Sequence, residues 1–187
     1  MDTPYQWTKQ VASHWGGTRN GTIVHWPRGF AARGETRQQF HHVIDIAPTV
    51  LDVIGIEAPS SIAGVEQQPV EGRSFAGTFA DPESPTRDTQ YFEMLGCRAI
   101  YHDGWKANCP WPGPSFVEAA EKGRRFGSAL TADDLEDLDA TGWELYRLTD
   151  DPTETRNLAA DDPAKLTEMI ERWYHEAETY GVFPLAA

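Results

Sequence analysis

Three β-prone runs follow one another in residues 89–109, and they constrain the fold more than any other feature of the sequence. The runs are TQYFEML (89–95), CRAIYHD (97–103) and GWKANC (104–109). Asp103-Gly104, between the second run and the third, is a dipeptide typical of a tight hairpin turn. We therefore expect three successive antiparallel strands, and a further strand at WELYRL (143–148).

The last element is predicted to be an amphipathic helix. Asp162 is a suitable N-cap, Pro163 suits the first helical position, and Gly181 follows the end. Apolar residues recur every three or four positions, the spacing of one helical face: Leu166, Met169, Ile170, Trp173 and Ala177. A shorter helix is expected at 45–56, with Asp45 as N-cap and Gly55 as a left-handed C-cap.

The remaining segments are less regular. NGTIVHWPRG (20–29) predicts a strand that Pro27 and Gly29 end. Residues 57–89 are rich in Pro, Gly and Ser and predict a long surface connection, while alternating prolines exclude a helix from 109–116. One or two short acidic helices are expected in 117–141. Strands alternate with helices, and a meander comes late, which indicates an α/β or α+β arrangement.

Composition and charge exclude several classes of partner. The net charge is -13, so we expect no nucleic-acid partner, and no apolar run is long enough to span a membrane, so we expect no membrane partner. Cys97 and Cys109 lack the CxxC spacing of a metal site and are interpreted as buried thiols, with pairing across a hairpin as the alternative. The first residues do not form a signal peptide. The protein is then cytoplasmic unless its true N-terminus is missing, and the compartment stays open.

The densest group of chemically capable side chains lies near the start, in TKQVASHWGGTRNG (8–21). Lys9 could hold an ammonium beside developing negative charge, and His14 could donate a hydrogen bond or a proton. Arg19 could bind an anionic substrate through its planar guanidinium. Gly16 and Gly17 would let the backbone turn sharply or approach a ligand closely. The alternatives are a surface lysine, a packing histidine, a structural salt bridge and a plain turn.

Two other patterns are not interpreted as metal sites. His41 and His42 are adjacent, so on a strand they would point to opposite faces, and no third ligand has a convincing spacing. The acidic run DDLEDLD (133–139) lacks the glycine and the alternating oxygen ligands of a calcium-binding loop. We expect it to be a solvated helical face.

Three stretches, in this order, resemble the second half of the sulfatases, especially the large bacterial arylsulfatases of the alkaline-phosphatase-like superfamily. They are KQVASHWGGTRNGTIVHWP (9–27), HHVIDIAPTVLDVIGI (41–56) and WELYRLTDDPTETRNLA (143–159). The resemblance covers nearly the whole chain. It implies part of an α/β sulfatase fold, with 1–56 as the C-terminal end of the catalytic domain and 57–187 as a C-terminal subdomain. That subdomain would contain long loops, a small antiparallel sheet and a packed terminal helix.

The resemblance also implies sulfuric ester hydrolysis that depends on calcium and on a formylglycine formed within a C/S-x-P-x-R motif. This sequence contains neither that motif nor the family's metal-binding aspartates and Asp-Asn pair. We therefore expect a C-terminal part that supplies Lys9, and with it His14, to a site acting on a sulfate-ester small molecule. Alone it would bind neither cofactor and would be inactive, because the nucleophile would come from a missing N-terminal part of the same protein.

The match to the family is incomplete around the lysine. Trp15 takes the place of the glutamate that the family commonly has before its glycine pair, and the spacing from Lys9 is one residue longer. Two other functions therefore stay open. One is a phosphatase or phosphonate monoester hydrolase of the same superfamily, and the other is a non-enzymatic binding module derived from a sulfatase half. The stretch WELYRLTDDPTETRNL is interpreted as structural, a strand that enters a hydrogen-bonded turn.

Overall fold

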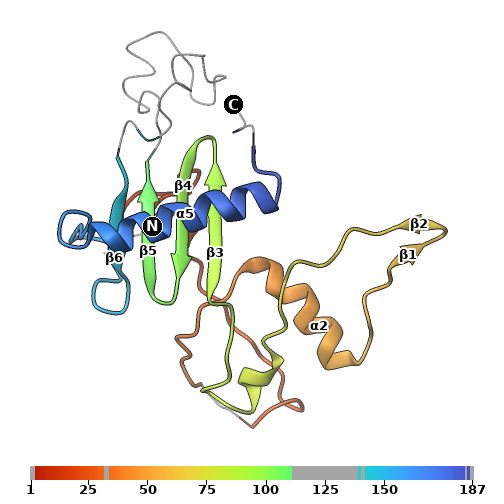
Figure 1. The fold of residues 1–187 in the computed structure, drawn as a ribbon. Coiled ribbons are helices and arrows are strands. Elements are labelled where there is room, and N and C mark those ends of the chain that lie inside the picture. Colours follow the sequence, from red (N-terminus) through yellow and green to blue (C-terminus); the bar gives the residue numbers. More distant parts are fainter. Residues whose placement is uncertain (1–2, 32–33, 111–138, 140–141, 184, 186–187) are drawn as a thin grey trace. The chain divides into compact units, whose positions relative to one another are not determined.

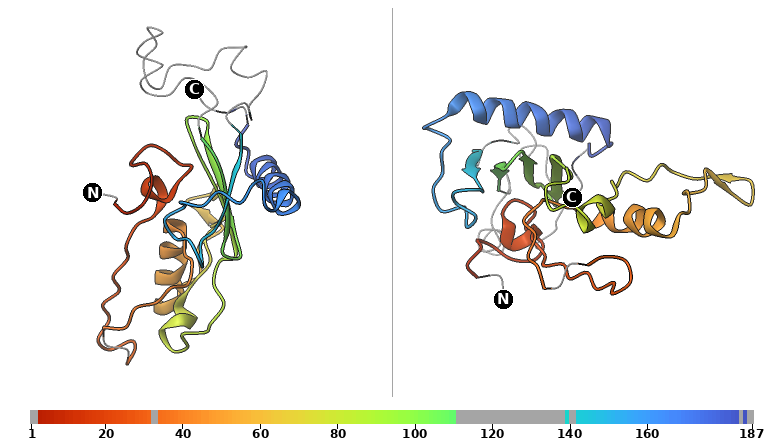
Figure 2. Two further views of the ribbon diagram at one scale, coloured as in Figure 1. Left: turned by 90° about the vertical axis from the view of Figure 1, so that its left-hand side faces the viewer. Right: turned by 90° about the horizontal axis from the view of Figure 1, so that it is seen from below.

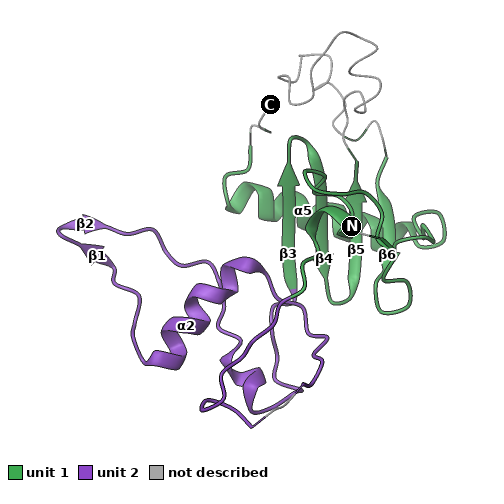
Figure 3. Cartoon of the chain, turned by 180° about the vertical axis from the view of Figure 1, so that it is seen from behind, with its two compact units in different colours: residues 1–21, 89–187 green, residues 22–88 purple. Residues whose placement is uncertain are grey.

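The structure, a computed structural model, describes residues 3–31, 34–110, 139, 142–183 and 185. The chain divides into two compact units, which are treated separately below (Figure 3). Unit 1 comprises residues 1–21 and 89–187, and unit 2 comprises residues 22–88. The boundary expected after residue 56 therefore lies within unit 2.

A four-stranded antiparallel sheet forms the centre of unit 1 (Figure 1). Its strands pair in sequence order: β3 (Thr89–Met94), β4 (Cys97–His102), β5 (Trp105–Cys109) and β6 (Glu144–Arg147). The two turns between the first three strands are Leu95-Gly96 and Asp103-Gly104. All four of these residues have positive φ, as a type I′ hairpin turn requires. The predicted meander and the strand at 143–148 are confirmed.

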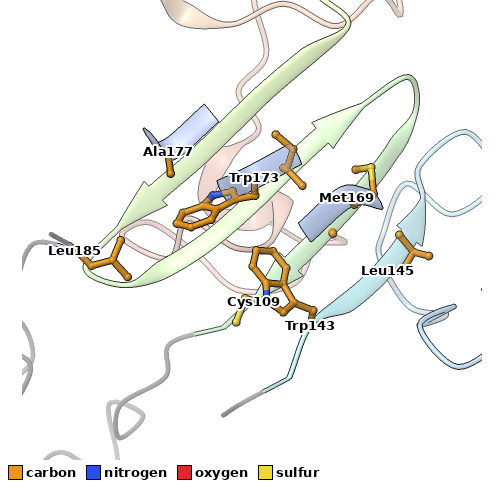
Figure 4. Packing of buried hydrophobic residues seen from close by; sticks show 9 residues of the cluster. Cys109, Trp143, Leu145, Met169, Trp173, Ala177 and Leu185 are labelled. Carbon is orange, nitrogen blue, oxygen red and sulfur yellow. The ribbon is translucent and has the colours of Figure 1, made fainter. Parts of the chain in front are cut away.

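Helix α5 (Pro163–Thr179) packs on one face of this sheet. The side chain of Asp162 accepts a hydrogen bond from the backbone N of Lys165 at 3.0 Å, as the predicted N-cap should. The fully buried residues of α5 are spaced by four positions: Met169, Trp173 and Ala177. In Figure 4 they lie against residues of the sheet and of its flanks, among them Cys109, Trp143, Leu145 and Leu185. The predicted terminal helix is confirmed.

The two faces of strands β5 and β6 carry different chemistry. Side chains alternate along a strand, so Ala107 and Cys109 share the face that α5 covers. Lys106 and Asn108 lie on the opposite face, where the register places them across from Tyr146 and Glu144. Figure 2 (left) shows the sheet from the side, with α5 on one side and the N-terminal segment, in red, on the other. The apolar face thus builds the main core, and the polar face receives the N-terminal segment.

The two cysteines belong to different clusters. Cys109 packs in the main core under α5, and Cys97 packs with Val11 and Ala12 of the N-terminal segment. Both are buried thiols, which confirms the first interpretation of these residues.

Unit 2 is built around a short helix. Helix α2 (Ile46–Ile54) follows the 3₁₀ turn η1 (Val43–Asp45), and its C-cap Gly55 has a φ of 70°, as predicted. The side chain of Asp45 does not cap α2, because its carboxylate binds elsewhere. The connection after α2 contains a two-residue hairpin, β1 (Ser61–Ile62) with β2 (Val65–Glu66), and the 3₁₀ turn η2 (Ala76–Phe79). The rest of 57–88 is irregular, as expected.

The prediction of a strand at 20–29 is wrong. Residues 20–26 have extended or irregular backbone, and a turn at the end is closed by a 2.9 Å hydrogen bond from the Gly29 N to the Trp26 carbonyl. Ile23 is 96% exposed. Strand preference reflects packing against neighbouring strands, and within the described ranges no strand pairs with this segment. Most of the segment 109–116 and nearly all of 117–141 lie outside the described residues, so those predictions remain predictions.

Candidate functional site

Lys9 lies in a tight turn near the start of unit 1. The backbone N of Val11 donates to the carbonyl of Thr8 at 3.2 Å, which places Lys9 and Gln10 at the centre of the turn. Gln10 has a φ of 77°, and Trp7, just before the turn, has a φ of 62°. Positive φ is uncommon outside glycine and is an outlier for a bulky residue, so the surrounding contacts must hold this conformation. The turn leaves Lys9 exposed.

Gly16 and Gly17 let two stretches of backbone touch. The N–H of Gly16 donates to the carbonyl of Gln6 at 3.0 Å. A Cβ added to Gly16 would lie 2.2 Å from that carbonyl oxygen, and one added to Gly17 would lie 1.8 Å from the carbonyl oxygen of Val11. Both glycines therefore serve close backbone packing, which closes residues 6–16 into a loop with Lys9 at its far end.

His14 is buried and has a partner at each ring nitrogen. Its Nε2 lies 2.9 Å from the Glu144 carboxylate, and its Nδ1 lies 3.1 Å from the Ser13 hydroxyl. Its ring packs edge-on against Tyr146, with 5.9 Å between ring centroids. Burial alone would raise the pKa of Glu144, but the hydrogen bond and charge of His14, helped by Tyr146, bring it below the usual value. His14 thus ties the N-terminal segment to strand β6.

Arg19 is exposed and stacks on two aromatic rings. Its guanidinium carbon lies 4.5 Å from the ring centroid of Trp15 and 4.8 Å from that of Tyr5. These are cation–π distances, and they give Arg19 a role in packing the ends of helix α1 (Trp15–Thr18) and the first residues together. The contacts of Arg19 among the described residues are therefore ring stacking, and its role toward a substrate or a salt bridge stays a prediction.

A buried carboxylate of unit 1 that the sequence did not single out joins several elements. Glu154, in the turn after β6, is fully buried and has a φ of 57°. Its Oε1 accepts hydrogen bonds from Lys106 Nζ at 2.7 Å and Asn108 Nδ2 at 2.8 Å. Its Oε2 accepts one from the backbone N of Trp15 at 2.7 Å. This carboxylate therefore joins strand β5 to the N-terminal segment.

Lys106 completes the link. Its Nζ also donates to the carbonyl of Ser13 at 2.6 Å, and the residue is fully buried. Burial lowers the pKa of Lys106 from its usual 10.5 to about 8, although the neighbouring Glu154 carboxylate opposes this. A signal for this cluster does exist in the sequence. Lys106 and Asn108 alternate with the buried Ala107 and Cys109, and polar residues so placed require a buried partner.

Unit 2 contains a second buried carboxylate. Asp45 accepts hydrogen bonds from the Arg87 guanidinium and from the backbone N atoms of His42 and Arg73, the latter two at 2.8 Å. Burial alone would raise the pKa of Asp45, but these donors bring it below the usual value. A hollow of about 200 Å3 lies beside this group, between His41, Phe75, Pro85 and their neighbours. Burial lowers the pKa of His41, whose ring packs on Phe75 with 4.5 Å between centroids.

The comparisons with known proteins show a likeness to the sulfatases. A sequence model described as Sulfatase matches residues 1–56, which include Lys9, His14 and the glycine pair. An uncharacterized sulfatase of Schizosaccharomyces pombe is 28% identical over 168 residues, or 88% of this chain. These findings support a likeness between this chain and a C-terminal part of the sulfatases.

Solved structures show a likeness to this chain at the level of the fold. A structure from work on glycosaminoglycan metabolism by Bacteroides thetaiotaomicron aligns with 88% of this chain, with a TM-score of 0.61 and 20% identity. The structure of BT4656 in complex with its substrate D-glucosamine-2-N,6-O-disulfate aligns with 87% of it, with a TM-score of 0.54 and 18% identity. The alkaline-phosphatase-like sulfatase fold expected for the chain is thereby confirmed for the part that it spans.

The chain spans only a fraction of these sulfatases. It covers 26% of the S. pombe protein and 30% and 28% of the two solved chains. Among the described residues, no group of three or more His, Cys, Asp or Glu side chains is arranged to hold a metal ion. The described part also contains no helix with the length and apolar character needed to cross a membrane.

Proposed function

We propose that this chain contributes to a sulfuric ester hydrolase of the arylsulfatase type, and that Lys9 is its catalytic side chain. The observation that carries the proposal is the exposed position of Lys9 on a strained turn, within the segment that matches the sulfatase family. Backbone outliers of this kind cluster at functional sites. The likeness to the sulfatases supports the proposed class of reaction, and the strained turn supports the choice of Lys9.

The chemistry proposed for Lys9 is charge stabilisation. Cleavage of a sulfate ester builds negative charge on the sulfuryl oxygens and on the departing oxygen. An ammonium held beside both positions stabilises that transition state more than the ground state. Lysine suits this role because its compact charge sits on a long stem and its three protons can reach more than one oxygen.

His14 and Arg19 receive supporting roles in this proposal. His14 is 2% exposed, and both of its ring nitrogens face protein groups, which favours holding the loop in place over donating a proton to a leaving group. Arg19 is exposed, so its guanidinium could meet an anionic substrate with one edge while its face stays on Trp15.

The proposed cofactors, calcium and formylglycine, do not fit the described residues of this chain. No metal-binding group of side chains is present among them, and both cysteines are buried in packed clusters outside any C/S-x-P-x-R motif. We place both cofactors on an N-terminal part of the same protein, which would also supply the nucleophile. The substrate would be a sulfate-ester small molecule, and a sulfated sugar such as the one that BT4656 binds is a second probe.

Reading the gene upstream of the Met1 codon and assaying the product of the whole frame tests the proposal. We expect an in-frame C/S-x-P-x-R motif, hydrolysis of 4-nitrophenyl sulfate by the whole product, and none by residues 1–187 alone. Lys9→Ala should lower kcat by roughly 10²–10³-fold, the loss typical of removing one charge-stabilising donor. Lys165→Ala, on α5, is the matched control and should leave kcat unchanged.

Three outcomes would contradict the proposal. Turnover of 4-nitrophenyl sulfate by residues 1–187 alone would show that the nucleophile lies in this chain. An unmodified upstream Thr or Ser nucleophile, with faster cleavage of the phosphate than of the sulfate ester, would identify a phosphatase of the same superfamily. A stop codon directly upstream, with a chain that is monomeric and resists proteolysis, would identify a free-standing binding module.

A further inference from the structure

The loop that carries Lys9 is attached to the rest of unit 1 at both of its ends, and both attachments lead to one residue. At the first end, the side-chain Nε2 of Gln6 donates to the backbone carbonyl of Glu154. At the second end, the backbone N of Trp15 donates to the Glu154 carboxylate at 2.7 Å. The loop is closed on itself between these ends by the bond from Gly16 to Gln6.

A third attachment passes through the ion pair. Lys106 is bound to Glu154 at 2.7 Å and holds the carbonyl of Ser13 at 2.6 Å. Ser13 and Trp15 flank His14, which is bound separately to Glu144. Three successive residues at the end of the loop, 13–15, are therefore bound to the sheet. Lys106 of β5 binds the first, Glu144 of β6 the second and Glu154 of the following turn the third.

Glu154 keeps an unfavourable backbone conformation in order to make these contacts. A φ of 57° is rare for a residue other than glycine, asparagine or aspartate. The residue is also a fully buried acid, which is costly unless its charge is paired and hydrogen-bonded. Its carboxylate accepts hydrogen bonds from three donors, of which one belongs to the loop and two to β5.

We infer that Glu154 and Lys106 are positioning residues for Lys9, in that they fix both ends of the loop of residues 6–16 on the polar face of the sheet. This inference rests on the proposed function of Lys9 for its catalytic meaning. The mechanical part, that the pair holds the loop, stands on the contacts alone. A lysine on an anchored loop keeps its ammonium group in one position. On a released loop the ammonium group would occupy many positions, and the rate gained from correct orientation would be lost.

Hydrogen–deuterium exchange of residues 1–187 tests the mechanical part without any enzyme assay. The variant is Glu154→Gln with Lys106→Met, which removes both charges together and so leaves neither one buried alone. We expect peptides covering residues 5–18 to exchange at least about tenfold faster, with β4 and α5 unchanged. The single variant Glu154→Gln should show the same local effect with a larger loss of stability, and Glu171→Gln, exposed on α5, is the control.

Kinetics of the whole product, if it cleaves sulfate esters, test the link to Lys9. The double variant should lower kcat with little change in KM, and adding Lys9→Ala to it should cause no further loss. Additive losses would show that the pair acts independently of Lys9. Two results would overturn the inference even if sulfatase activity is found. In one, residues 5–18 of the double variant exchange at the wild-type rate, and in the other, exchange rises equally in residues 5–18 and in α5. If activity is absent but local exchange rises, the proposed function fails and the anchoring stands.

Discussion

Glu154 and Lys106 are 48 positions apart in the sequence, and their charged groups meet at 2.7 Å in the interior of unit 1. Neither side chain is exposed to solvent. Such a pair gives little net stability, because removing both charges from water costs about as much as their attraction returns. The pair instead favours one arrangement of the N-terminal segment. In that arrangement the backbone N of Trp15 donates to Glu154, and the carbonyl of Ser13 accepts from Lys106.

The glycine pair should be intolerant of any side chain. Gly16→Ala and Gly17→Ala would each place a methyl group within about 2 Å of a backbone carbonyl oxygen, so we expect each to lower the free energy of unfolding by about 2 kcal/mol or more. Gly21→Ala is the matched control, because a Cβ there meets nothing within 4 Å. Urea denaturation measures all three. Equal stability of Gly16→Ala and Gly21→Ala would show that the backbone contact at Gln6 is absent.

The buried lysine should make stability depend on pH in the alkaline range. The pKa of Lys106 is lowered to about 8 by burial, so between about 8 and 10.5 the unfolded chain holds one proton more than the folded chain. The contribution of Lys106 to the free energy of unfolding therefore rises with pH across this window, by at most about 3 kcal/mol. Relative to Lys106→Met, the wild type should gain stability from pH 8 upward.

Urea denaturation at several pH values measures that difference. Lys9→Met, at an exposed lysine, is the control and should follow the wild type throughout. A wild type that loses stability relative to Lys106→Met between pH 8 and 10 would mean that the folded state raises the pKa of this lysine.

The contact between His14 and Glu144 should control stability in acid. Burial alone would raise the pKa of Glu144, but the hydrogen bond and charge of His14, together with Tyr146 and Lys106, bring it below its usual value of 4.5. A lowered folded-state pKa contributes stability that is present above 4.5 and disappears as the pH falls through the folded-state value. Glu144→Gln should therefore be less stable than the wild type at neutral pH, and the gap should narrow below pH 4.5. Glu171→Gln is the control variant. A stability difference between the wild type and Glu144→Gln that widens in acid would contradict a lowered pKa for Glu144.

Asp162 should account for the start of helix α5. Its side chain caps the helix by accepting from the backbone N of Lys165, so Asp162→Ala should cost about 1 kcal/mol. The neighbouring Asp161 only pairs with the exposed Arg156, and Asp161→Ala should cost at most about 0.5 kcal/mol. Thermal unfolding of the two variants side by side makes the comparison. Equal losses would show that the cap is not formed in solution.

Local rules were sufficient to predict the regular part of the fold. The Asp103-Gly104 turn and the cap at Asp162 depend on neighbours within a few positions, and both occur as expected. The segment at Ile23 was predicted as a strand because its residues favour one, yet strand formation depends on a neighbour to pair with, which no local pattern specifies.

The candidate site was predictable only in part, for a different reason. The resemblance to the sulfatases pointed to the loop of Lys9 and His14, but not to what holds it. Glu154 lies in a stretch rich in turn-forming residues, where an acidic side chain ordinarily faces water. Its burial follows from a contact with Lys106 across the sheet, and charge pairs between distant positions leave no periodic trace in a sequence. The alternation of Lys106 and Asn108 with buried residues was the one available signal.

The anchoring of the first residues by Glu154 has a consequence for how the protein is made. The ribosome adds Gln6 to the chain 148 positions before Glu154, the residue that binds it. Strands β3, β4 and β5 are consecutive and can pair as they emerge, because their contacts are short-range. The loop with Lys9 can close on itself through the bond from Gly16 to Gln6, but it stays unattached to Glu154 until the turn after β6 has left the exit tunnel. We therefore expect the loop of residues 6–16 to stay accessible to chaperones and proteases until the turn after β6 has emerged from the ribosome.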